Sequence, residues 1–248
     1  MKFSYSAVWD DTLRLVREHG ALLAAIAGVF IFLPSLLLSY LVAAPEAVSA
    51  DPQEAFQISM DYYRANVHWF LLVGIIAMWG SLAMLRLVFP RQATVAGAIS
   101  AAIALLPFYL LVSIISGFII GIGLFLLILP GLYLAARLIV AAPVMVAEDR
   151  RNPLDAISRS FAVTKGHGWA ILGLIVLIGI AAVVVMGVVN AMLGIAFTLI
   201  AGQDLGRLLS LIVSSATSAA FTVVLTVVYA AIYRALVGDA ASTARVFE

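Results

Sequence analysis

Long apolar runs, separated by short polar stretches, make up most of this chain. Six of them are long enough to be membrane-crossing helices, because a helix needs about 20 apolar residues to span the hydrocarbon of a bilayer. Barrel strands would instead alternate apolar and polar positions, and these runs do not. The pattern predicts an all-α, polytopic membrane protein with six transmembrane helices at about 21–43, 67–88, 94–114, 118–146, 169–200 and 206–236.

Two shorter segments are amphipathic and are expected to lie along the cytoplasmic membrane surface, at about 7–18 and 153–165. Their apolar faces align position by position, and each segment is followed by a His-Gly pair and a long apolar run. This correspondence predicts an internal duplication whose copies run in the same direction. Gly20 and Gly168 are expected to end the surface helices and to turn the chain into the bilayer.

Two further helix starts can be placed from capping residues. Asp51 followed by Pro52 predicts a helix on the outer side that runs directly into the second span. Asn152 followed by Pro153 predicts the start of the second surface helix for the same reason.

Charge sets the expected orientation. When both termini are placed in the cytoplasm, 12 of the 14 Lys and Arg residues fall on the cytoplasmic side, in agreement with the positive-inside rule. Only Arg64 and Arg207 fall on the outer side. We therefore expect a bacterial-type inner (plasma) membrane protein, with cytoplasmic basic residues at Lys2, Arg14, Arg17, Arg86, Arg91, Arg137, Arg150, Arg151, Arg159, Lys165, Arg234 and Arg245.

Composition strengthens the membrane assignment and narrows the chemistry. Hydrophobic residues make up 65% of the chain and charged residues 11%, and the mean hydropathy is +1.15. The absence of cysteine excludes disulfides, thiolate metal ligands and cysteine nucleophiles. The sequence has no HExxH motif, no Ser–His pair and no adjacent intramembrane carboxylates. We expect no catalytic residue, no metal, no cofactor and no nucleic-acid partner.

One stretch carries a recognisable motif. It contains Leu-Pro-Gly-Leu-Tyr-Leu at 129–134, then Arg137, Ala-Pro-Val-Met-Val at 142–146, Glu148, Arg-Ser-Phe, Thr-Lys-Gly and finally Trp169. This motif resembles the membrane domain of glycerophosphoryl diester phosphodiesterase and its stand-alone YciC-like relatives. In some members a fused soluble domain hydrolyses glycerophosphodiesters, whereas nearly all of this chain is committed to apolar or interfacial segments. The resemblance implies the architecture and does not transfer the activity.

Arg137 is the most unusual residue of this stretch, because a guanidinium inside hydrocarbon costs a few kcal/mol or more unless it finds a polar partner. Glu148 follows 11 residues later, about 16 Å along a straight helix, so Arg137 is expected well below the surface. A tight uncharged turn around residues 113–117 and a helix break at Pro130 and Gly131 are expected upstream. Three roles are open: donating to carbonyls at helix breaks or ends, binding a lipid phosphate or other anion, or gating a polar pathway.

Basic residues continue from Arg137 to the cytoplasmic surface. Positive charge beside a cytoplasmic loop is required for topology alone, and it attracts anionic headgroups without any specific site. The concentration of polar residues into one span and its neighbouring surface helix nevertheless favours a site. The candidates for binding an anion or lipid headgroup are Arg137, Glu148, Arg150, Arg151, Arg159, Ser160 and Lys165.

The last apolar run carries hydroxyl residues at fourfold spacing. Such a stripe is typical of close helix packing, with the hydroxyls bonded to carbonyls of the same or a neighbouring helix, and a hydrophilic pathway is the alternative. Its members are Ser210, Ser214, Ser218, Thr222 and Thr226.

Taken together, these features favour a non-enzymatic multi-pass membrane protein that binds or organises anionic lipid, or that serves as a membrane scaffold for a protein partner. The alternative hypothesis is a small-molecule or lipid transporter, with a pocket near Arg137 and the hydroxyl stripe.

Overall fold

The computed structural model describes residues 3–43, 45, 51–89 and 94–244, and of 239–244 it describes the backbone alone. Lys2, Arg91 and Arg245, which contributed to the predicted orientation, lie outside the described residues. The all-helical prediction is confirmed for the described part. Its elements are α1 (Tyr5–Ala27), the π-helix η1 (Gly28–Phe32), α2 (Leu33–Leu41), α3 (Pro52–Val88), α4 (Val95–Leu126), α5 (Ile128–Leu138), α6 (Ala141–Glu148), α7 (Pro153–Val163) and α8 (Gly168–Ala244).

Among the described residues, five helical runs are long and apolar enough to cross a membrane: Tyr5–Leu41, Pro52–Val88, Val95–Leu126, Ile128–Glu148 and Gly168–Gly238. The last run is bent back on itself at Gly202, whose φ of +76° and ψ of −178° are open to glycine but not to other residues. Six apolar segments result, in agreement with a polytopic membrane protein.

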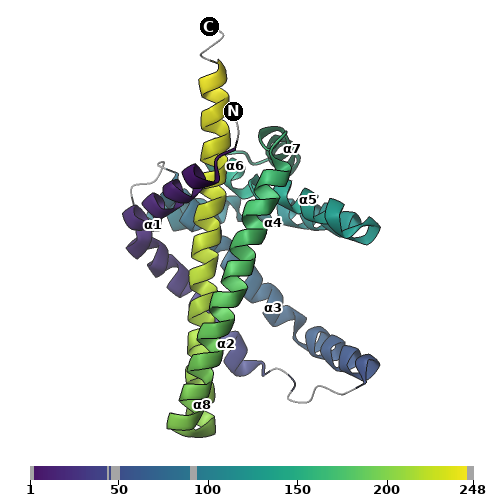
Figure 1. Cartoon of the computed structure of the whole chain (residues 1–248), viewed down its shortest axis with the longest axis vertical. Helices are drawn as coiled ribbons and strands as arrows, with labels where there is room; N and C mark the ends of the chain where they lie inside the picture. The colour runs from purple at the N-terminus through teal and green to yellow at the C-terminus, as the bar shows by residue number, and fades with distance from the viewer. Residues whose placement is uncertain (1–2, 44, 46–50, 90–93, 245–248) are drawn as a thin grey trace.

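The two arms of α8, residues 168–201 and 203–244, run side by side as a long hairpin (Figure 1). Gly206 allows the close approach at the turn, since a Cβ there would lie 2.9 Å from the backbone of Phe197. Farther along, Asn190 Nδ2 donates to Thr217 Oγ1 at 3.3 Å. This polar pair links the two arms.

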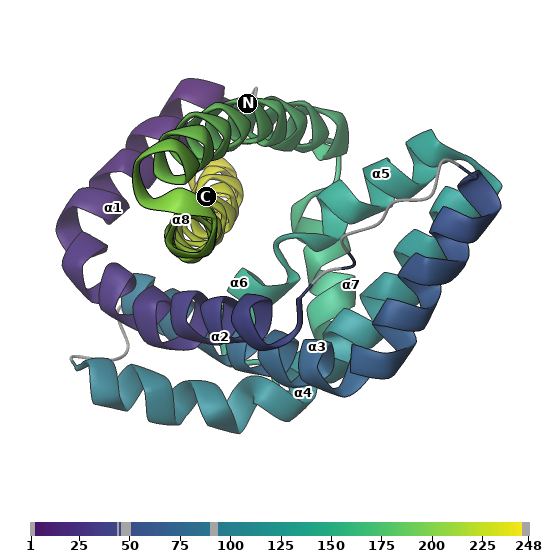
Figure 2. The same ribbon diagram turned by 90° about the horizontal axis from the view of Figure 1, so that it is seen from below.

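The first surface helix does not end at Gly20, as predicted, but continues through η1 into α2. The predicted turn occurs only after α7, and there Gly166, with φ +81°, makes it rather than Gly168. In the alignment of the two copies, Gly166 corresponds to Glu18. The first copy thus lacks the glycine that the turn needs, so its helix stays continuous and curves around the side of α8 (Figure 2).

Exchanging these two glycines for alanine is expected to have opposite effects on stability. Gly166→Ala should lower the free energy of unfolding by roughly 1 kcal/mol, because a Cβ is strained in the left-handed conformation. Gly20→Ala should raise it by up to about 1 kcal/mol, because Gly20 is helical and its Cβ position is open. Titration with sodium dodecyl sulfate in mixed micelles measures both changes. Equal destabilisation by the two variants would contradict the difference in backbone conformation.

Capping supports the proposed duplication. The Ser4 hydroxyl accepts from Ala7 N at the start of α1, and the Asn152 side chain accepts from Leu154 N at the start of α7. The same offset of 148 positions pairs the buried residue Thr12 with the buried residue Ser160. It therefore relates α1–α3 to α7–α8 and leaves α4–α6 as a segment between the copies.

The ion pairs follow the same offset, which matches Arg86 near the end of α3 with Arg234 in α8. Arg86 Nη2 lies 2.7 Å from Asp149 Oδ1, and Arg234 Nε lies 3.4 Å from Asp11 Oδ2. Both equivalent arginines thus tie the end of an apolar run to an aspartate outside that run.

The predicted turn at residues 113–117 is wrong, because α4 runs through it for 32 residues. The chain reverses instead at Leu127, whose backbone is extended, and the predicted break at Pro130 is displaced to this position. Pro130 is the third residue of α5, in the first turn, where a missing N–H removes no helical bond. Gly123 and Gly131 flank the reversal, and a Cβ on Gly123 would lie 2.8 Å from Gly131 Cα. These glycines let the backbones of α4 and α5 pack closely.

Two buried clusters hold the helices together. The larger joins α1, η1, α3, α4, α5, α6 and α8 and includes Leu23, Leu82, Met84 and Ile232. The smaller joins α4, α5, α6 and α7, and its fully buried members are Val112, Leu138, Ala141, Met145, Ala156 and Ile157.

Candidate functional site

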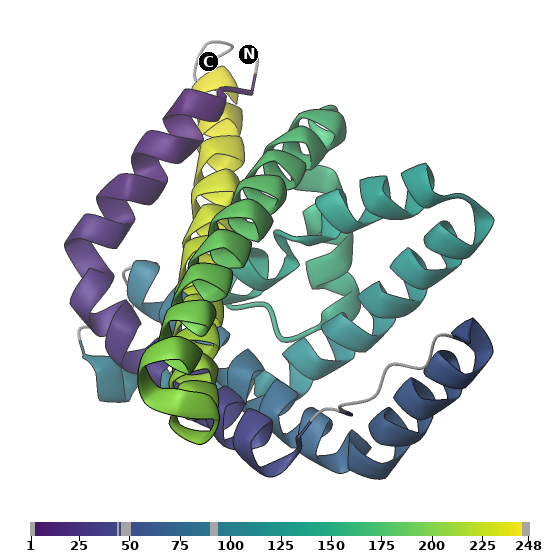
Figure 3. The same cartoon turned by 60° about the horizontal axis from the view of Figure 1, so that its bottom comes forward.

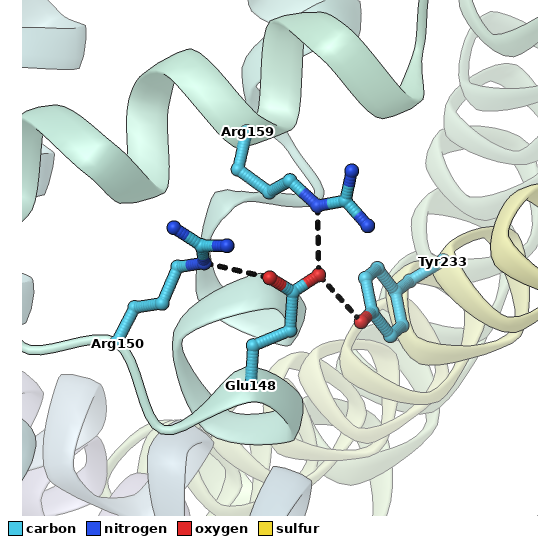
Figure 4. A network of polar contacts seen from close by, with 4 residues as sticks. All are labelled: Glu148, Arg150, Arg159 and Tyr233. Carbon is cyan, nitrogen blue, oxygen red and sulfur yellow. Dashed lines mark hydrogen bonds and ion pairs between the residues drawn. The ribbon is translucent and has the colours of Figure 1, made fainter.

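Glu148, the last residue of α6, is the centre of a polar cluster beside α7. Its carboxylate accepts from Arg150 Nε at 2.6 Å, from Arg159 Nε at 2.9 Å and from Tyr233 Oη at 3.0 Å (Figure 4). These four residues, called the Glu148 cluster below, come from α6, the following loop, α7 and the second arm of α8. One carboxylate therefore fixes side chains from four parts of the chain.

The local backbone explains how these residues meet. Asp149 ends α6 in a left-handed conformation, with φ +53°, so the chain turns sharply before Arg150. The Asn152 cap and Pro153 then start α7, which carries Arg159. Arg159 is thereby placed above the end of α6, within reach of Glu148.

The Glu148 cluster carries an excess of positive charge. Two guanidinium groups share one carboxylate, and the side chains of Arg150 and Arg159 are each 39% exposed. In Figure 4 the dashed contacts to Glu148 start from Nε of each arginine, and one terminal nitrogen of each points away from the carboxylate. The hydrogen bond to Glu148 is the main cause that raises the pKa of Arg150. The cluster thus presents two cations that are held through Nε, each with one terminal nitrogen directed away from the carboxylate.

Arg137 belongs to a separate group at the end of α7. Its Nε donates to Thr164 Oγ1 at 3.2 Å, and its Nη2 donates to the carbonyl of Phe161. The Ser160 hydroxyl returns a bond of 2.6 Å to the Arg137 carbonyl. The guanidinium carbon also lies 4.8 Å from the centre of the Phe161 ring and 5.8 Å from that of Tyr133.

These contacts change the expected relation between Arg137 and Glu148. That expectation assumed a straight helix from Arg137 to Glu148, but α5 ends at Leu138 and α6 begins at Ala141. Arg137 bonds to one end of α7 while Glu148 bonds to Arg159 within α7. Both residues therefore lie at the level of the same amphipathic helix. Arg137 finds its carbonyl at a helix end, where a cation is favoured by the helix dipole, rather than at Pro130.

The remaining candidates do not join either group. The side chains of Arg151 and Lys165 are exposed. In the hydroxyl stripe, Ser210, Thr222 and Thr226 donate to carbonyls four residues earlier in their own helix, and Ser214 donates to a carbonyl three residues earlier. These bonds occupy the donors of four of the five stripe residues within α8.

The family model for the membrane domain of glycerophosphoryl diester phosphodiesterase matches residues 104–246. This match covers more than half of the chain, from within α4 through α8, and it includes the whole Glu148 cluster. The chain belongs to this membrane-domain family. No curated protein and no solved structure matches the chain.

The sequence analysis of this membrane-domain family member did not predict two polar contacts, one within the Glu148 cluster and one beside it. Tyr233 stands in an apolar run beside Arg234, and a tyrosine at a helix end beside a basic residue was a usable sign of an interfacial polar contact. The ion pair of Arg86 with Asp149 joins residues 63 positions apart. No local pattern signals such a distant pair.

Proposed function

We propose that this protein is a non-enzymatic, multi-pass membrane domain that binds the phosphate group of an anionic phospholipid at the cytoplasmic face of a bacterial-type inner membrane. The observation that carries the proposal is the pair of exposed guanidinium groups, Arg150 and Arg159, that Glu148 holds in place. Guanidinium forks match the geometry of phosphate oxygens and form charge-assisted hydrogen bonds with them.

Prior fixation of the two arginines favours binding. A free arginine side chain loses roughly 2 kcal/mol of rotamer freedom when it is immobilised, and Glu148 has already restricted both side chains before a ligand arrives. The cluster also keeps a net charge of about +1, since two cations face one carboxylate. An anion that approaches the outer nitrogens therefore meets donors that are positioned and only partly neutralised.

The surroundings favour a lipid over a soluble anion. Arg159 lies on α7, whose apolar residue Leu154 is exposed, and Trp169 is exposed at the start of α8. Such apolar and aromatic side chains suit the membrane boundary, where headgroup phosphates are concentrated. We limit the proposal to binding and do not extend it to transport, because the donors of Arg137 and of most stripe hydroxyls already bond to protein acceptors.

The double variant Arg150→Gln/Arg159→Gln is expected to lose at least about tenfold in retention of phosphatidylglycerol, because two charge-assisted contacts disappear. Native mass spectrometry measures the retained lipid, with phosphatidylethanolamine as the zwitterionic comparison. Arg64→Gln/Arg207→Gln is the matched control, since it removes the same charge from the outer side. Inorganic phosphate and glycerol phosphate, offered as competitors, distinguish a lipid site from a free-anion site.

Glu148→Gln separates a positioned site from general charge attraction. The substitution makes the face more positive by one charge, so unspecific attraction would retain more phosphatidylglycerol. A site that depends on fixed arginines should retain severalfold less, because the neutral amide holds them weakly. Increased retention by Glu148→Gln, or equal retention by the double variant and the unmodified protein, would overturn the proposal and leave the scaffold role.

A further inference from the structure

Length and hydropathy qualify both α4 and the run formed by α5 and α6 as membrane spans. The packing of α4 and α5 against α3, α7 and α8 argues instead that neither helix crosses the membrane. Three sets of contacts locate the start of α4, its middle and α5 relative to the membrane face on which α7 lies.

The start of α4 lies close to that face. Trp79 Nε1, two turns before the end of α3, donates to the carbonyl of Ile99 at 2.9 Å. Arg86, near the end of α3, pairs with Asp149 in the loop that leads to α7. The end of α3 and the first turns of α4 therefore lie at the same level as that charged loop.

The middle of α4 also lies at that face. Val112, Ile115 and Phe108 pack in one cluster with Ala156 and Ile157 of α7. From Val95 to Ile115 a helix advances about 30 Å, which equals the thickness of the hydrocarbon. A crossing α4 would have carried Ile115 to the opposite face. Its packing against α7 instead places Ile115 on the same side as the start of α4, which favours a path of α4 along the membrane plane.

The end of the α4–α5 hairpin is close to the same level. Tyr133 of α5 lies against the start of α8, since a Cβ on Gly168 would be 2.5 Å from Tyr133 Cε2 and the Tyr133 and Trp169 rings are 5.1 Å apart. Leu127 at the reversal precedes Tyr133 by six residues, or about 9 Å of helix. That length is too short to bring the reversal to the far side of the bilayer.

The side chains at the reversal show what surrounds it. Residues 125–129 are Phe-Leu-Leu-Ile-Leu, and their exposed fractions range from 62% to 91%. Five large apolar side chains in water would be strongly unfavourable, at about 25 cal/mol per Å². The backbone itself is suited to hydrocarbon, because Leu127 N donates to the Gly123 carbonyl and Gly131 N donates to the Leu127 carbonyl.

We propose that α4 and α5 form a re-entrant hairpin that lies within the leaflet next to α7, with residues 125–129 among the acyl chains of that leaflet. The chain then crosses the membrane four times, through the α1–α2 run, α3 and the two arms of α8. Figures 1 and 3 show α5 and the adjoining part of α4 extending away across the direction of α8. Both ends of the hairpin stay at one face, so the orientation of the other helices is unchanged.

The duplication agrees with this arrangement. Each copy begins with an amphipathic helix at the membrane face and continues into two crossing segments. The hairpin belongs to α4–α6, which lies between the two copies. The inference does not rest on lipid binding by the Glu148 cluster. The hairpin would therefore be unaffected whether or not the protein proved selective for phosphatidylglycerol.

A depth scan with single spin labels tests the hairpin, and the absence of native cysteine makes each label unique. Cysteines are placed at exposed positions, and membrane depth is obtained from the relative accessibility to oxygen and to a water-soluble nickel complex. Along α4 the depth should stay within one leaflet, without a maximum followed by a return to water. The α4 positions are Ile103, Leu111, Ile114, Phe118, Ile122 and Phe125.

The first arm of α8 provides the internal control, because labels at Leu177, Val183, Val188 and Ile195 should pass through one depth maximum. A second measurement assigns the side. An impermeant maleimide should label Gln53→Cys, near the start of α3, but not Ile128→Cys from the same side. A maximum near Ile114, or labelling of Ile128→Cys from the Gln53 side, would overturn the hairpin in favour of two crossing helices.

Discussion

Arg137→Ala is expected to lower the free energy of unfolding by about 3 kcal/mol, because it removes two charge-assisted hydrogen bonds and two cation–π contacts. The loss should be greatest at the end of α7, where the Phe161 carbonyl is left without this donor. Unfolding by sodium dodecyl sulfate in mixed micelles gives the total change. Hydrogen exchange at the amides of 160–168 should rise more than exchange in the arms of α8.

Two comparisons decide whether Arg137 acts through this geometry. Arg151→Ala removes an exposed arginine at the same face and should change stability by less than about 0.5 kcal/mol. Arg137→Lys keeps the charge but lacks the planar fork, so it should recover less than half of the loss. If Arg137→Ala destabilised the protein only in anionic lipid and not in zwitterionic lipid, a bound anion rather than the end of α7 would be its partner.

Gly131→Val is expected to lower the free energy of unfolding by about 2–3 kcal/mol, because it overpacks the contact between α4 and α5. A Cβ at Gly131 would lie 2.5 Å from the backbone nitrogen of Leu124, so the helices themselves must separate. The same denaturation measurement reports the change. A label pair at exposed Ile122 and Leu132 should also show a longer and broader distance distribution.

Gly121→Val is the matched control for this experiment. The position lies in the same hairpin, yet apart from its own helical turn no atom lies within 4 Å of its Cβ position. Valine favours the helical conformation slightly more than glycine does, so this variant should be neutral or slightly stabilising. If both variants destabilised the protein equally, general intolerance of the hairpin rather than the contact of Gly131 with Leu124 would be responsible.

The lipid-binding proposal and the hairpin proposal concern neighbouring parts of the chain, the Glu148 cluster and α4–α5. Arg137 holds the end of α7 through protein acceptors, so we place phosphate recognition on Arg150 and Arg159, each of which has one terminal nitrogen directed away from Glu148. The hairpin lies beneath α7, in contact with its buried residues Ala156 and Ile157. A headgroup at the arginines and acyl chains along the hairpin would then belong to the same leaflet.

The sequence by itself determined which segments are helical and where several of them begin. Runs of about 20 apolar residues leave the backbone no alternative to helices in hydrocarbon, and the caps at Asp51 and Asn152 act within one turn. The offset between the two copies was also visible, because it depends on matching side chains along the chain. The residues of the candidate site were mostly named as well, since polar groups are conspicuous in so apolar a sequence.

Only the tertiary structure decided where the chain turns and which polar groups meet. The reversal lies at Leu127, three residues before the predicted break at Pro130, because its position depends on the packing of Gly123 against Gly131. The partners of Glu148 and Arg137 come from helices that are distant along the chain, and Tyr233 is 85 positions from Glu148. Hydropathy measures how favourably a segment leaves water but not the direction of its helix axis. The contacts of α4 and α5 with α3, α7 and α8 are therefore needed to distinguish an in-plane hairpin from two crossing helices.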